Sequence, residues 1–140
     1  MLDRLGRWKI HVLETGDFRL DGGAMMGSVP KVLWSKTNPP DKLNRIDLSL
    51  RCLLLVDGDR KVLVETGMGN KFDEKFGDMF CIKQSDNPLT DSLEKIGYTT
   101  EDITDVVLTH LHFDHSGGAT VKNFKGEVVP MFEKATYHIS

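Results

Sequence analysis

Four side chains that commonly bind divalent metals lie within one short stretch of the sequence: His110, His112, Asp114 and His115. They include three of the five histidines in the chain. Imidazole nitrogens and carboxylate oxygens bind zinc at about 2.0–2.2 Å, and imidazole also suits iron, nickel and copper. A single catalytic ion usually takes three protein ligands, so four side chains favour two pairs that serve two ions about 3.5–4 Å apart. The spacing therefore predicts a metal centre.

The segments on either side of these residues predict how the metal ligands are held. "DVVLTH" reads as a short buried strand, and the alternation of a strand places His110 and His112 on one side of its frayed end. Asp114 and His115 then fall on the following turn, and "SGGA" is expected to open a helix. We expect the metal-binding motif to span residues 105–119.

The rest of the chain alternates between strand, loop and helix patterns. Residues 7–23 alternate as an edge-type strand would, and residues 22–46, which are rich in glycine and proline, predict a long loop. Residues 48–56 and "KVLVETG" flank the turn "DGD" and predict a hairpin. Such a mixture is typical of an α+β or layered α/β fold.

Helical spacing and turn residues mark the second half of the chain. Leu89, Leu93 and Ile96 recur at helical spacing, and Thr99 or Thr100 could cap a short turn. The tail "KGEVVPMFEKATYHIS" predicts further strand that is broken at Pro130.

Composition narrows the class of protein. The 140 residues are 39% hydrophobic and 28% charged, which is typical of a globular domain, and the net charge of −3 argues against a nucleic-acid partner. No apolar stretch is long enough to span a bilayer and no signal peptide is evident, so we expect a cytoplasmic protein without a membrane partner. Cys52 is expected to be buried and Cys81 half-buried, without a disulfide between them.

At "THLHFDHSGG", together with the upstream "KVLVETGMGN", the sequence resembles the metallo-β-lactamase superfamily. The resemblance implies an αββα sandwich, in which two sheets lie between outer helices and the metals lie at one edge. "DGGAMMGSVPKVLWS" and "NKFDEKFGDMF" resemble a lactonase-like branch, which opens N-acyl homoserine lactones.

The resemblance also implies roles for particular residues. His110 and His112 would bind the first of two divalent ions, and Asp114 and His115 the second. Zinc is expected first, with iron, manganese, nickel or cobalt as alternatives. A hydroxide between the ions would attack the carbonyl of a lactone or ester, and Asp114 would act catalytically by passing a proton to the leaving group. Glu65 stands where the family usually has Asp and would orient the ligands from the second shell.

The loop at residues 22–46 is expected to lie near the active site. Its Met25 and Met26 are expected to contact an acyl substrate, since no basic cluster suggests a phosphate.

The family needs three further ligands, a His, a bridging Asp and another His. After His115 this chain offers only Glu127, Glu133 and His138. The sequence therefore resembles the N-terminal half of such an enzyme, mainly one mixed sheet with a flanking helix, across residues 1–140. We expect an exposed apolar sheet face that a C-terminal half or a second copy of the chain would cover. For His11 and His138 we expect structural roles.

Two other functions remain open. One is a truncated, non-catalytic module that binds metal weakly and forms oligomers. The other keeps the fold and changes the chemistry, to a thioesterase or an iron dioxygenase.

Overall fold

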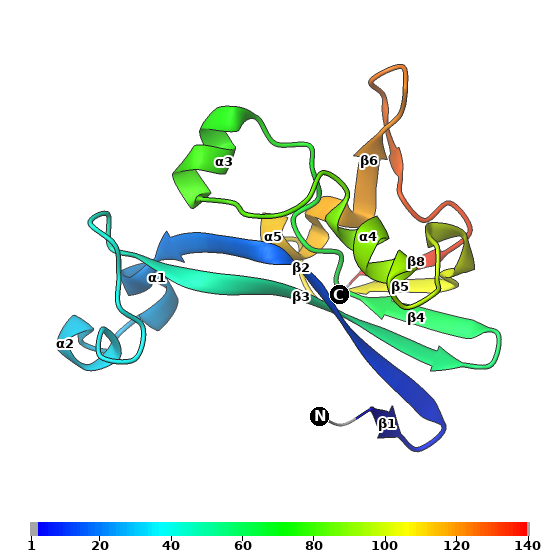
Figure 1. Ribbon diagram of the computed structural model, residues 1–140, viewed down its shortest axis with the longest axis horizontal. Helices are drawn as coiled ribbons and strands as arrows, with labels where there is room; N and C mark the ends of the chain where they lie inside the picture. The colour runs from blue at the N-terminus through cyan, green and yellow to red at the C-terminus, as the bar shows by residue number, and fades with distance from the viewer. Residues whose placement is uncertain (1–2, 140) are drawn as a thin grey trace.

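The computed structural model describes residues 3–139, so positions 1, 2 and 140 of the expected 1–140 unit lie outside the described residues. Six strands form a mixed sheet in the order β1-β2-β3-β4-β5-β8, and β6 pairs with β7 in a separate hairpin (Figure 1). The strands are β1 (Arg4–Leu5), β2 (Trp8–Asp21), β3 (Arg45–Asp57), β4 (Arg60–Val64), β5 (Asp105–Leu108), β6 (Thr120–Lys122), β7 (Val128–Pro130) and β8 (Thr136–Ile139). The chain thus has the α+β class that its sequence predicts, dominated by one mixed sheet.

The helices are short and pack mainly beside this sheet. They are α1 (Gly22–Met26), α2 (Lys31–Trp34), α3 (Glu74–Phe80), α4 (Pro88–Glu94), η1 (Thr100–Asp102), α5 (Phe113–Ser116) and η2 (Gly117–Ala119). Figure 1 shows α3 and α4 on one side of the long β2–β3 pair. The helix predicted from the spacing of leucines is α4, and the capping box of η1 uses Thr99 as expected.

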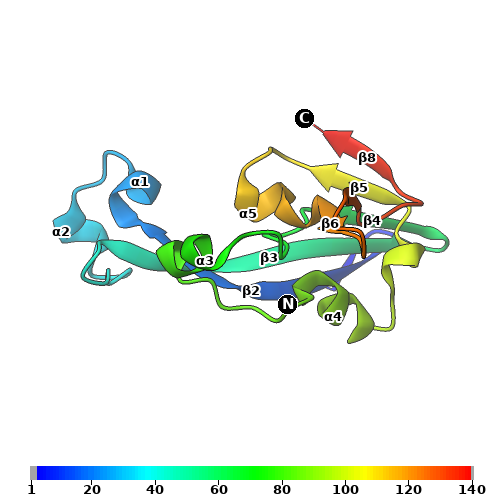
Figure 2. The same cartoon turned by 90° about the horizontal axis from the view of Figure 1, so that it is seen from above.

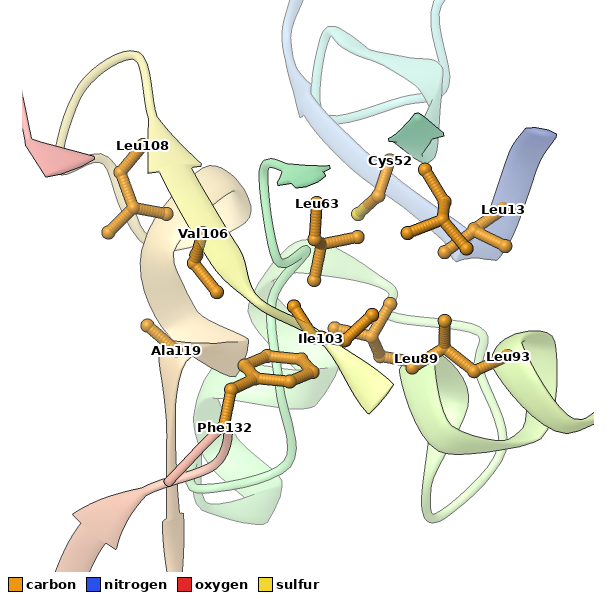
Figure 3. Packing of buried hydrophobic residues seen from close by; sticks show 11 residues of the cluster. Leu13, Cys52, Leu63, Leu89, Leu93, Ile103, Val106, Leu108, Ala119 and Phe132 are labelled. Carbon is orange, nitrogen blue, oxygen red and sulfur yellow. The ribbon is translucent and has the colours of Figure 1, made fainter. Parts of the chain in front are cut away.

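The main core lies between the sheet and α4 (Figure 3). Leu54, Leu63 and Val106 from three neighbouring strands are fully buried against Leu93 of α4 and Phe132. A fully buried leucine contributes about 1.5–3 kcal/mol through removal of its apolar surface from water. This packing holds β4 and β5 rigidly, and the predicted metal ligands follow the second of these strands.

Strand β3 has two different faces, although its sequence predicted an almost continuous apolar strand. One face buries Ile46, Leu50, Cys52 and Leu54, and the other carries polar residues along its first half. On that second face Leu53 remains 39% exposed and neighbouring Val12 38% exposed. The exposed apolar surface is therefore narrower than the sequence suggested.

The prediction of an edge-type first strand holds for most of β2. Strand β1 covers only Trp8 and Lys9, because the chain turns back after Leu5, and from Ile10 to Asp21 the strand that pairs with β2 is β3. The described edges of the sheet are β1 and β8.

The long loop predicted at residues 22–46 contains two short helices, α1 and α2. The carboxylate of Asp21 accepts a hydrogen bond from the backbone N–H of Ala24 and begins α1, and Trp34 of α2 is buried against Gly22. These local contacts make two short helices out of a glycine-rich segment. In Figures 1 and 2 the helices project at one end of the β2–β3 pair.

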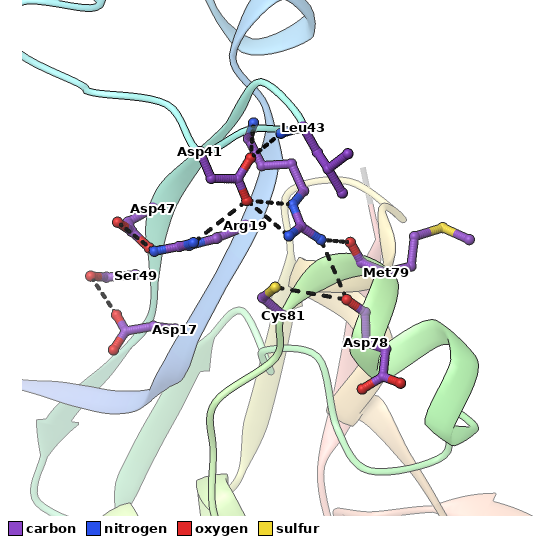
Figure 4. A network of polar contacts seen from close by, with 10 residues as sticks. Asp17, Arg19, Asp41, Leu43, Asp47, Ser49, Asp78, Met79 and Cys81 are labelled. Carbon is purple, nitrogen blue, oxygen red and sulfur yellow. Dashed lines mark hydrogen bonds and ion pairs between the residues drawn. The ribbon is translucent and has the colours of Figure 1, made fainter.

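Charged side chains fix the base of this projection (Figure 4). The Asp41 carboxylate accepts hydrogen bonds from the backbone N–H and the guanidinium of Arg45 at 2.9 and 2.8 Å. The backbone hydrogen bond from Arg45, followed by its guanidinium, holds the pKa of Asp41 at about 2. Arg45 also donates to the carbonyl of Met79 at 2.7 Å, which joins the start of β3 to the end of α3.

None of the helices in residues 3–139 has the length and apolar character needed to cross a membrane.

Candidate metal centre

The candidate centre forms where β4 and β5 end side by side. The two strands are parallel, with Val64 opposite Val107, so the residues that follow them emerge at the same edge of the sheet. Glu65 follows β4 directly, and its N–H donates to the carbonyl of Val107 at 2.9 Å. Figure 2 shows α5 beyond the carboxyl end of β5. The strand pairing therefore brings Glu65 next to the histidine motif.

The helix after the motif begins earlier than predicted. It starts at Phe113, inside the motif, and ends at Ser116; Gly117 is its C-cap, and residues 117–119 form the 3-10 turn η2. Asp114 and His115 consequently lie on the first turn of α5. A hydrogen bond of 2.8 Å, from the N–H of Thr66 to the carbonyl of His115, fixes this turn against the end of β4.

Two glycines allow that close approach. A Cβ atom on Gly118 would lie 2.1 Å from the carbonyl oxygen of Thr66, and one on Gly117 would lie 2.0 Å from that of Met68. No side chain fits at such distances, so only glycine lets the two backbone segments meet. The N–H of Gly118 donates to the carbonyl of Gly67 at 3.1 Å, which closes the contact.

The four motif side chains lie close together. The ring centroids of His110 and His115 are 4.0 Å apart, and those of His110 and His112 are 4.8 Å apart. The Nε2 atom of His115 lies 3.3 Å from a carboxylate oxygen of Asp114. His110, Asp114 and His115 are half-buried and His112 is exposed. The structure thus brings the predicted ligands to one place.

Glu65 contacts Thr109, the residue that precedes this cluster. Its Oε1 accepts hydrogen bonds from the backbone N–H of Thr109 at 3.2 Å and from the Thr109 hydroxyl. That hydroxyl also lies 3.0 Å from Nδ1 of His110. Since its one hydrogen goes to Glu65, it is arranged to accept from a protonated Nδ1, which leaves Nε2 of His110 free to bind a metal.

The second oxygen of Glu65 reaches the other pair of ligands. Its Oε2 lies 3.4 Å from Nδ1 of His115, and it is buried without a hydrogen-bond partner among the described residues. One carboxylate therefore faces a histidine of each predicted metal pair. Glu65 itself has φ +65°, a left-handed conformation that costs an ordinary residue about 1–2 kcal/mol.

These residues fit a divalent cation. One donor atom each from Glu65, His110 and His115 lies within 4.8 Å of the others, and the set offers imidazole nitrogen and carboxylate oxygen. The unpaired, buried Oε2 of Glu65 supports the fit, because a buried carboxylate oxygen is costly unless a hydrogen-bond donor or a cation compensates it. This group includes Glu65, which was predicted from the sequence to orient the ligands, and does not include His112 and Asp114.

Aromatic side chains form an apolar wall beside the motif. Phe113 of α5 packs against Phe76 and Phe80 of α3, with ring centroids 5.3 and 5.0 Å apart, and Phe72 adjoins Phe76. This wall was not predicted from the sequence. Its signal was the spacing of four between Phe72, Phe76 and Phe80, which places them along one helical face.

Met25 and Met26 are not brought to this wall. Both lie on α1, which Figures 1 and 2 show well separated from α5 along the β2–β3 pair. Their contact with a substrate stays a prediction.

The remaining histidines and cysteines lie elsewhere. His138 on β8 pairs with Asp105 at 2.9 Å and lowers the pKa of that carboxyl, and His11 packs edge-on against Tyr98. Cys52 is buried and Cys81 half-buried, and both are free thiols. Burial raises the pKa of Cys52 to about 12, which keeps this thiol protonated and unreactive.

Comparison with known proteins gives a consistent result. The profile of the Metallo-beta-lactamase superfamily matches residues 47–121, just over half of the chain. An N-acyl homoserine lactonase of Bacillus cereus is 32% identical over 84 residues, which cover 54% of this chain and 34% of that protein. The chain therefore spans about a third of the length of the curated relatives it matches.

Solved structures resemble the whole described fold. A probable metal-dependent hydrolase from Staphylococcus aureus superposes with a TM-score of 0.84 at 33% identity, over 96% of this chain and 47% of that one. AidC, a dizinc quorum-quenching lactonase, superposes with a TM-score of 0.67 at 26% identity, over 96% of this chain and 42% of that one.

Proposed function

The chain belongs to the metallo-beta-lactamase superfamily, and from this membership we propose that it forms the metal-binding part of a hydrolase that opens a lactone or ester. The observation that carries the proposal is the convergence of Glu65, His110 and His115 at the ends of β4 and β5. The relatives named as N-acyl homoserine lactonases make an N-acyl homoserine lactone the first substrate to test.

We assign one pair of motif residues to each of two ions. His110 and His112 would hold the first, and Asp114 and His115 the second. Divalent ions bound there, zinc first, would act as Lewis acids that polarise the substrate carbonyl and lower the pKa of a water molecule. A dizinc lactonase among the structural relatives supports the number and the metal.

The chain's own side chains would do the remaining work. Asp114, whose side chain is 22% exposed, is open enough to pass a proton to the leaving alcohol. Glu65 and Thr109 would keep His110 in one tautomer and orientation. The wall formed by Phe76, Phe80 and Phe113 favours an acyl substituent over a charged group, because it offers apolar contact beside the centre.

Four motif side chains do not complete two coordination spheres. We propose that further ligands come from another segment of the intact protein or from a second copy of the chain. Relatives more than twice as long as the matched region support the first source.

The test is hydrolysis by the intact protein loaded with zinc. N-hexanoyl homoserine lactone, a thioester and a phosphodiester are compared, with proton release measured for the lactone. We expect turnover of the lactone, its loss in Asp114→Asn and His110→Ala, and its retention in the control His138→Ala. Turnover of the thioester alone would mean that the protein is a thioesterase and not a lactonase. Full activity in Asp114→Asn and His110→Ala would refute the metal centre.

A further inference from the structure

The ammonium group of Lys71 is bound to the segment that follows the metal motif. Its Nζ donates to the carbonyl of Thr120 at 2.6 Å and to the carbonyl of Gly117. Gly117 is the C-cap of α5, two residues after His115, and Thr120 opens β6. One side chain therefore joins the two ends of η2 to the loop after β4.

The carbonyl of Thr120 needs a donor that the local backbone does not supply. The N–H of Met131 donates to the carbonyl of Ala119. In an antiparallel pair, alternate residues point their carbonyls toward and away from the partner strand, so the carbonyl of Thr120 points away from β7. Gly117 opens the 3-10 turn η2, in which each carbonyl faces the N–H three residues later, so Lys71 adds a further hydrogen bond to its carbonyl. Lys71 thus supplies the donor for Thr120 and reinforces Gly117.

Partial burial of the charged ammonium of Lys71 costs free energy unless hydrogen bonds compensate it. Burial, together with the neighbouring charge of Lys122, lowers the pKa of Lys71. No carboxylate in residues 3–139 lies within ion-pair distance of its Nζ. The two charge-assisted hydrogen bonds are its compensation. The half-buried ammonium is bound by two backbone carbonyls, so it restrains the segment to which those carbonyls belong.

That segment lies nearer to one half of the metal centre than to the other. Asp114 and His115 lie on α5 itself, within three residues of its C-cap Gly117, whereas His112 is the N-cap at the opposite end of the helix. His110 precedes α5 and is held separately, through Thr109 and Glu65. Glu65 thus lies beside both halves of the motif, whereas the contacts of Lys71 lie closest to Asp114 and His115.

We propose that Lys71 is a positioning residue for the second metal, which fixes Asp114 and His115 by holding the carbonyls of Gly117 and Thr120. This proposal rests on the two-ion centre of the proposed function. Removing the ammonium lets the C-terminal end of α5 shift, so the second ion loses affinity, while the first ion, held by His110 and His112 before the helix, is affected less.

The test is a cobalt titration of the intact protein, followed by the visible absorption of the bound ion. The wild type is expected to bind in two steps, with His115→Ala as the reference that lacks the second step. In Lys71→Met the affinity of the second step should fall roughly tenfold to hundredfold, as for other residues that orient metal ligands, while the first changes less than about threefold.

Two further variants separate positioning from charge and general stability. Lys71→Arg keeps N–H donors and should recover most of the second-step affinity. Lys122→Met removes the same charge from an exposed position on β6 and should bind both ions as the wild type does. Thermal unfolding of each metal-free variant is measured in parallel.

Unchanged binding in Lys71→Met, equal loss at both steps, or the same loss in Lys122→Met would overturn the proposal. Lactone turnover has no part in this titration. If Lys71→Met weakens only the second binding step and the protein opens no lactone, the proposed function would be contradicted and the role of Lys71 would stand.

Discussion

At the scale of single residues, the feature that most distinguishes this centre is Glu65. It stands in a left-handed conformation at the end of β4, and its carboxylate contacts Thr109 on one side and lies near His115 on the other. Strained backbone of this kind persists only where surrounding contacts hold it. Glu65 is thus arranged to couple the two pairs of ligands.

Replacing this carboxylate by an amide should weaken metal binding without unfolding the protein. Glu65→Gln keeps the length and one carbonyl oxygen for Thr109, but it loses the negative charge beside His115. We expect zinc affinity to fall roughly tenfold to hundredfold, measured by competition with a chelator. Thr109→Val should lower the affinity for the ion at His110 more than the affinity for the ion at His115. Wild-type affinity in Glu65→Gln would show that this carboxylate does not support the ligands.

A second residue predicts how stability depends on pH. Burial, with a smaller contribution from Lys9, lowers the pKa of His11 below its ordinary value of 6.5. The unfolded chain therefore takes up a proton at a higher pH than the folded chain does, and the free energy of unfolding falls as pH drops below about 6.5. Chemical denaturation of the metal-free protein between pH 7.5 and 5 measures this loss.

His11→Phe should remove that part of the pH dependence, because phenylalanine fills the site beside Tyr98 and does not titrate. His138→Phe is the control, since His138 is exposed and paired with Asp105. A pH dependence that is the same in His11→Phe as in the wild type would assign the effect to other groups.

The residue types of the motif were sufficient to predict the location of the centre, but not its supports. His110, His112, Asp114 and His115 lie within six residues of the sequence, and the short loop after β5 and the first turn of α5 bring them together. The contacts of Lys71 with Gly117 and Thr120 span 46 and 49 residues of the chain. Only the tertiary fold creates them, so no local pattern could reveal them.

At the scale of elements, the centre depends on the backbone contact between the end of β4 and the segment after α5. Strand pairing explains why β4 and β5 end together, and the buried leucines and valines of their sequences predicted those strands. The start of α5 was misjudged because a short helix can begin within a motif whose residue types carry no helical signal. The two helices of residues 22–46 were missed because a cap at Asp21 and the burial of Trp34 override low helix propensity.

A methyl group at the tightest point of that contact should disrupt the centre. In Gly118→Ala the Cβ would lie 2.1 Å from the carbonyl oxygen of Thr66, so the segment must move. We expect the free energy of unfolding to fall by about 1–3 kcal/mol and zinc affinity to fall with it. Urea denaturation and a zinc titration measure the two effects.

Gly77→Ala is the matched control. Gly77 lies within α3, where the added Cβ would make only ordinary contact with Phe72 at 3.5 Å. We expect a gain of about 0.5–1 kcal/mol from higher helix propensity, with zinc binding unchanged. Equal behaviour of the two alanine variants would mean that the close backbone contact does not hold the centre.

At the scale of the whole molecule, the described fold places a partial ligand set at one edge of a sheet. The same sheet leaves Val12 and Leu53 partly exposed on the face opposite the core. The fold class and the family could be predicted, because the mixture of strand and helix patterns and the histidine motif can both be read from a single sequence. The extent of the exposed face could not be predicted, because it depends on which side chains of β3 find partners across β2.

The most direct test of the two-ion centre is anomalous diffraction at the zinc edge from crystals of the intact, zinc-loaded protein. We expect two zinc peaks about 3.5–4 Å apart. His110 and His112 should bind one, and Asp114 and His115 the other, at about 2.0–2.2 Å, with Glu65 beside them. An absence of zinc at this edge of the sheet, with the four side chains directed apart into solvent, would contradict the two-ion centre.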